Sequence, residues 1–105
     1  MASEEMTKYK IEIDPDLLDL APVLMDSLNN ELEDMLGSIL KSDFELVIEK
    51  AHSSRGAALT FGFELYAYKM LQIKKEALNE DKEALLKICK GLEVMLDCVE
   101  FTVAK

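Results

Sequence analysis

The feature that most constrains this chain is a helical spacing of apolar residues, repeated in four successive stretches. Apolar side chains three or four positions apart form one face of a helix, which has to pack against other helices. The pattern predicts helices over residues 14–40, 44–61, 63–78, and from 82 to 99 or beyond. We therefore expect an all-α fold, an antiparallel up-down four-helix bundle with a short N-terminal extension or extra helical turn.

Start and stop signals separate these stretches. Asp14 followed by Pro15 is typical of a helix start. Pro22 is expected to split the first stretch into a short turn and a longer helix ending near Leu40. The other signals are a cap at Ser42 or Asp43, a stop at Gly62, and a cap at Asn79 or Asp81.

Size and charge exclude several classes of protein. With 105 residues the chain forms one domain, and we expect a flexible lead-in over residues 1–13 and the bundle over residues 14–105. A net charge of -9 argues against binding to nucleic acids or to an anionic membrane surface. No apolar run is long enough to span a bilayer. Cys89 and Cys98 are too far apart on one helix to be bonded, which favours a reducing, cytoplasmic location.

The second predicted helix carries an unusual histidine. At about 100° per residue, His52 falls on the shoulder between the core stripe and the solvated face. Ile48 and Leu59 lie on the same shoulder and supply apolar area for a transient partner. Gly56 lies one turn after His52, although glycine inside a helix costs about 1 kcal/mol relative to alanine. Its missing side chain would let a partner approach the imidazole.

Two cationic side chains are expected near this histidine. Arg55 lies one turn ahead of His52, and Lys74 falls on the apolar face of the third helix, from which its tip can reach outward. A neutral imidazole is a competent phosphoryl nucleophile near neutral pH. Arg55 and Lys74 would stabilise the phosphoryl oxygens. A single histidine and no glycine-rich phosphate loop leave little basis for a metal site or a nucleotide-binding enzyme.

This segment resembles the signature of the histidine-containing phosphotransfer (HPt) domain family of two-component phosphorelays. That signature is a His, a Lys or Arg three residues later, a Gly directly after it, small residues, and a second Gly about ten residues past the His. The matching residues are His52, Arg55, Gly56, Ala57-Ala58 and Gly62. The opening Ile13-Asp14-Pro15-Asp16-Leu17 is also similar, and the resemblance covers roughly residues 13–100.

The resemblance implies a role for each residue. His52 would be the phosphoacceptor, Arg55 the basic residue near the phosphate, and Gly56 the point of clearance for a partner. The partners would be response-regulator receiver domains, with a hybrid sensor histidine kinase as a further donor. The chain would have no ATP-binding or kinase activity and no cofactor of its own, because Mg²⁺ belongs to the receiver. We expect a monomer.

Two departures from the family pattern keep other interpretations open. Arg55 stands where Lys is commoner, and Lys74 stands 22 residues after the His, where many members carry a Gln or Glu that orients the imidazole. Lysine cannot accept a hydrogen bond from an imidazole N–H. One alternative is a helical module that docks a receiver or kinase without carrying phosphate. Another is a four-helix scaffold that self-associates through Ile48 and Leu59. Arg55 could also form a surface ion pair with Glu49 or Glu45, and Gly56 could serve helix packing.

Overall fold

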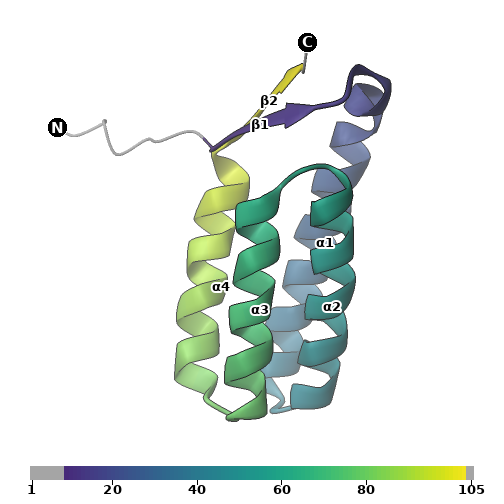
Figure 1. Cartoon of the computed structure of the whole chain (residues 1–105). Helices are drawn as coiled ribbons and strands as arrows, with labels where there is room; N and C mark the ends of the chain where they lie inside the picture. The colour runs from purple at the N-terminus through teal and green to yellow at the C-terminus, as the bar shows by residue number, and fades with distance from the viewer. Residues whose placement is uncertain (1–8, 104–105) are drawn as a thin grey trace, which may run out of the picture.

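The structure is a computed structural model that describes residues 9–103. It contains, in order, strand β1 (Tyr9–Ile13), the 3-10 helix η2 (Pro15–Leu20), helices α1 (Ala21–Leu40), α2 (Phe44–Thr60), α3 (Glu64–Leu78) and α4 (Lys82–Asp97), and strand β2 (Val99–Val103). The fold is mostly helical, and the four α-helices lie side by side (Figure 1). Contacts join α1 to α2, α2 to α3, α3 to α4 and α4 to α1, so the four helices enclose one core.

Local signals account for the helix starts. The Asp14 carboxylate accepts a hydrogen bond from the N–H of Asp16 and begins η2. Pro22 lies in the first turn of α1, where a helix needs no N–H donor. Asp43 and Asp81 cap α2 and α4, each by accepting a backbone N–H three residues ahead. These predicted starts are confirmed.

The turns between the α-helices each contain one residue in the left-handed region. These are Ser42 (φ 61°), Gly62 (φ 80°) and Glu80 (φ 55°). A left-handed residue just past a helix end lets the chain reverse over a few residues. The predicted stop at Gly62 is confirmed, and it ends α2 shortly after the segment that carries His52.

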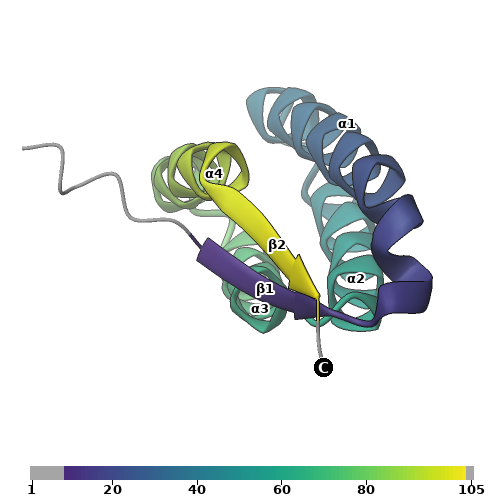
Figure 2. The ribbon, with the colours of Figure 1, turned by 90° about the horizontal axis from the view of Figure 1, so that it is seen from above.

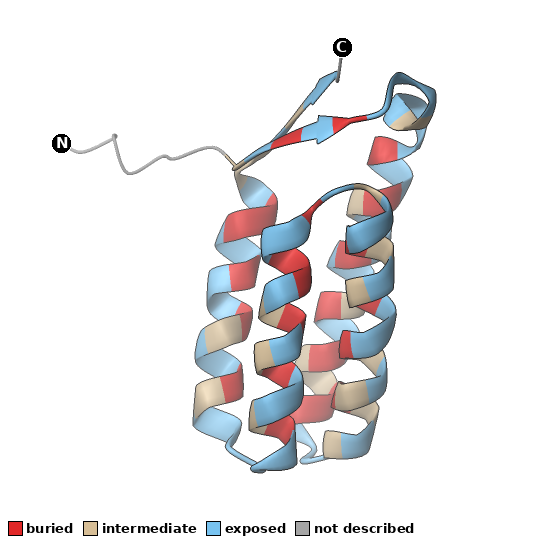
Figure 3. Ribbon diagram, viewed as in Figure 1, coloured by how far each residue is buried: buried red, intermediate tan, exposed pale blue. Residues whose placement is uncertain are grey.

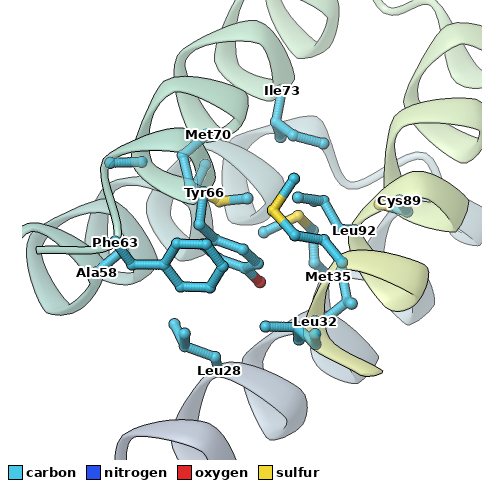
Figure 4. Close-up of a cluster of buried hydrophobic side chains, with 14 of the residues drawn as sticks. Leu28, Leu32, Met35, Ala58, Phe63, Tyr66, Met70, Ile73, Cys89 and Leu92 are labelled. Carbon is cyan, nitrogen blue, oxygen red and sulfur yellow. The ribbon is translucent and has the colours of Figure 1, made fainter. Parts of the chain in front are cut away.

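The core is built from the apolar stripes of all four helices (Figures 3 and 4). Its fully buried large side chains include Leu28 and Met35 of α1, Tyr66 and Ile73 of α3, and Leu92 of α4. By contrast, α2 buries mainly small side chains, namely Val47, Ala51, Ser54 and Ala58. The partly buried Phe44 and Ile48 of α2 add to its packing against the core.

Strands β1 and β2 were not predicted by the helical pattern. They pair in parallel, with Tyr9 opposite Val99 and Ile13 opposite Val103, and lie over one end of the helices (Figure 2). Ile11 and Ile13 are buried, so residues 9–13 are packed rather than part of a flexible lead-in. Residues 1–8 of that expected lead-in lie outside the described residues.

The predicted end of the fourth helix is also wrong. The apolar spacing predicts a helix to Val99 or beyond with Val103 on its buried face, but α4 ends at Asp97 and Val103 is 43% exposed in β2. The last described residues are Val99-Glu100-Phe101-Thr102-Val103, mostly β-branched or aromatic, and such residues favour strands when a partner strand is available. The all-α expectation therefore holds for the helices and fails for residues 9–13 and 99–103.

Cys89 makes the stability of this core dependent on pH. Its thiol is fully buried in α4, and burial, followed by the negative charge of Glu93, raises its pKa from the ordinary 9.0 to about 12. The unfolded chain therefore releases the thiol proton at lower pH than the folded chain. This contribution to stability is complete below about pH 9 and is lost as pH rises through about 12.

We expect denaturant midpoints to fall between pH 8.5 and 10 for the wild-type chain, and to fall less for Cys89→Ala. Cys98→Ala is the matched control, because it removes the partly exposed cysteine and leaves the buried thiol in place. The denaturant midpoint of this variant should fall with pH as steeply as that of the wild-type chain. Equal slopes for all three proteins would contradict the assignment. Burial likewise raises the pKa of Tyr66 above its ordinary 10.0, so a further loss is expected above that pH.

Candidate functional site

A groove between α2 and α3 brings together most of the residues singled out in the sequence. It has a volume of about 540 Å³, within the range of small-ligand sites. Helix α2 contributes five lining residues and α3 contributes three: Ile48, Glu49, Ala51, His52 and Arg55, and Met70, Leu71 and Lys74. One surface is thus lined by three residues that the sequence connects only through helical projection, namely His52, Arg55 and Lys74.

His52 is exposed at this groove. It follows the buried Ala51 on α2 and precedes the exposed Ser53, so it stands on the shoulder that helical projection predicts. Among residues 9–103, no side chain or backbone group forms a hydrogen bond with the imidazole. Because the side chain is exposed, an approaching electrophile can reach the imidazole.

Neither cation of the groove forms an ion pair with a carboxylate of the described chain. Arg55 is half-buried and Lys74 is exposed. Within residues 9–103 the ion pair found is Lys50–Asp34 (3.5 Å), so the alternative of an Arg55 pair with Glu49 or Glu45 is not observed. With Glu49 as the one acidic lining residue, the groove carries a small positive excess in an otherwise acidic chain. Such a site favours an anion.

Gly56 is exposed inside α2, and a Cβ placed there would meet nothing within 4 Å. Packing within the described chain therefore does not require glycine at this position, and the packing alternative is not supported. Gly37 and Gly91 are equally open, so they provide comparison sites on α1 and α4. Of the two predicted partner contacts, Ile48 is half-buried and lines the groove, whereas Leu59 is 46% exposed and lies outside the lining.

The sequence reasoning missed a polar link behind His52. Glu31 of α1 is half-buried and accepts hydrogen bonds from Ser53 (2.8 Å) and Ser54 (2.7 Å) of α2. The available signal was Ser54 itself, a hydroxyl in the core stripe, because buried polar groups need a partner. Glu49, Met70 and Leu71 were also not predicted as groove residues.

Neither a metal site nor a membrane-spanning helix is found within residues 9–103. Within residues 9–103, no three His, Cys, Asp or Glu side chains gather in a way that could hold a metal ion. No helix in the same range has the length and apolar character needed to cross a membrane. Compared with family models, curated proteins and solved structures, the chain has no match. What the groove can do therefore follows from its own side chains.

Proposed function

We propose that this chain is a phosphorelay carrier, which accepts a phosphoryl group on His52 from the aspartyl phosphate of a receiver domain, or from a kinase, and passes it to the aspartate of another receiver. The observation that carries the proposal is the exposed imidazole in one groove with two cations, Arg55 and Lys74, that form no ion pair within residues 9–103. The proposal includes an antiparallel up-down bundle of the HPt type, a cytoplasmic location and a monomeric carrier without catalytic activity on ATP.

The transfer chemistry needs little from the carrier itself. A lone pair of a neutral imidazole nitrogen attacks the phosphorus of the aspartyl phosphate, and the acyl-phosphate P–O bond breaks with its electron pair returning to the carboxylate. The ring N–H proton is released to solvent, and the onward step is the reverse reaction on another aspartate. Any Mg²⁺ is held by the receiver.

The groove supplies charge and clearance for this step. Arg55 and Lys74 carry the positive charge that offsets the phosphoryl oxygens, and charge-assisted hydrogen bonds are the stronger kind. The open position at Gly56 leaves room for the receiver's surface one turn from the imidazole. Ile48, half-buried in the groove, and Leu59, exposed outside its lining, offer apolar contact area.

The test is incubation of the chain with a receiver domain carrying a radioactive aspartyl phosphate. Label is expected to move to the chain in a form that is lost in acid and kept in alkali, and to leave again when an unphosphorylated receiver is added. Label that never reaches the chain from a panel of receivers, or that is stable to acid, would refute the carrier function.

A second candidate is a docking module that binds a receiver or kinase without accepting phosphate. The observation in its favour is that His52 has no hydrogen-bond partner among residues 9–103, and that Lys74 stands where an orienting acceptor would be useful. This candidate predicts partner binding, measured by calorimetry, that persists without any transfer of label.

Lys74 offers a prediction with a close control. Lys74→Met should lower the ratio of phosphorylated to unphosphorylated chain at equilibrium with a receiver about fivefold, the equivalent of ~1 kcal/mol for an exposed charge pair. Lys75→Met removes the same charge from the next residue of α3, which is exposed and outside the groove. It should change the ratio of phosphorylated to unphosphorylated chain less than twofold. Equal effects of the two substitutions would show that only the overall charge matters.

A further inference from the structure

The link between Glu31 and the two serines ties the turn of α2 that bears His52 to α1. Ser53 donates to one carboxylate oxygen of Glu31 and Ser54 to the other, at 2.8 and 2.7 Å. Both serines directly follow His52 in the sequence. We refer to Glu31, Ser53 and Ser54 as the polar clamp.

The geometry of the polar clamp opposes rotation of α2. Adjacent residues project about 100° apart around a helix, so Ser53 and Ser54 reach the carboxylate from two directions. Turning the helix either way stretches one of the two bonds. Ser54 is fully buried and Glu31 half-buried, so breaking the bonds leaves poorly solvated polar groups without partners.

Within residues 9–103, the side-chain hydrogen bonds that join the His52 turn of α2 to another helix are those of the polar clamp. The buried face of α2 consists of small side chains, with Phe44, Ile48 and Ala57 partly buried against the core. The His52 ring has no hydrogen-bond partner among residues 9–103. The rotation of α2 about its own axis therefore sets the direction in which the ring leaves the bundle.

We infer that Glu31 is a positioning residue, which acts through Ser53 and Ser54 to aim His52 at the docked receiver. This inference rests on the proposed carrier function. In-line attack tolerates little misplacement, and an error of about 1 Å costs up to about 10²-fold in rate. Loss of the polar clamp should accordingly slow transfer from a receiver that docks in one orientation, without making the imidazole a poorer nucleophile.

The experiment compares two phosphodonors, a phosphorylated receiver domain and phosphoramidate. Phosphoramidate is a small molecule that needs no docked orientation. For Glu31→Ala, we expect the rate of transfer from the receiver to fall about tenfold, while the rate with phosphoramidate stays within twofold of wild type. Glu31→Gln should rescue the receiver rate, because its amide oxygen accepts from one serine and its NH₂ donates to the other.

Two further variants complete the test. Glu33→Ala removes an exposed carboxylate from the same helix and should leave both rates unchanged. Ser53→Ala removes only an exposed hydroxyl, leaves the core intact and should reduce the receiver rate severalfold. If the Glu31→Ala or Ser53→Ala variant transfers from the receiver at the wild-type rate, or if the two donor rates fall together in Ser53→Ala, the positioning role is wrong. If the wild-type chain accepts no label from either donor, the carrier function itself fails.

Discussion

The His52→Gln variant is expected to accept no label from a phosphorylated receiver domain, whereas the wild-type chain becomes labelled. A glutamine amide nitrogen has its lone pair delocalised into the carbonyl group and is not a phosphoryl nucleophile. The chain contains no second histidine that could take over. Labelling should therefore drop to background, which is the largest functional effect expected from any single substitution in the groove.

The loss should be chemical rather than structural. His52 is exposed, and surface substitutions away from caps and networks usually change stability by less than about 0.5 kcal/mol. Glu49→Gln is the matched control on the same helix and in the same groove. It removes a negative charge near the incoming phosphoryl group, so it should become labelled at least as fast as wild type. Acid-labile label on His52→Gln would rule out His52 as the phosphoacceptor.

A large loss of stability is expected from Leu28→Ala. Leu28 is fully buried in α1 among side chains from the other helices, and removing its methyl groups leaves a cavity (Figure 4). The free energy of unfolding should fall by about 3 kcal/mol. That is a large part of the ~5–15 kcal/mol that stabilises a typical domain.

Leu40→Ala is the control for this prediction. It makes the same change on the same helix, but Leu40 is 63% exposed at the end of α1. This substitution should lower the free energy of unfolding by less than about 0.5 kcal/mol. Both values come from urea denaturation of the two variants beside wild type. A Leu40 variant as unstable as the Leu28 variant would mean that the core does not lie where the structure places it.

Helix ends were predictable because their causes are local. A capping carboxylate such as Asp43 bonds a backbone N–H three residues away, and Gly62 adopts a positive φ within its own turn. The sheet was not predictable in the same way. Tyr9 and Val99 pair across almost the whole chain, and apolar segments of five residues are too short to be assigned to a helix or a strand until their partner is known.

In the candidate site, too, features that depend on one helix were predictable, whereas features that depend on neighbouring helices were less so. Projection of one helix predicts that His52 stands on a shoulder with Arg55 one turn ahead, because both positions depend only on the 3.6-residue repeat. The expected position of Lys74 near His52 depends in addition on α3 packing against α2, and the clearance expected at Gly56 depends on no other segment packing there. Those facts depend on which helices become neighbours.

The sequence by itself determined the number of helices, most of their ends, and the residue types gathered around His52, since periodicity and capping act over a few residues. Only the tertiary structure decided that residues 9–13 and 99–103 form a sheet, that α2 and α3 share the groove, and that Glu31 accepts bonds from Ser53 and Ser54. Each of these joins segments distant in the chain, and such contacts depend on how whole helix faces pack rather than on the spacing of neighbouring residues.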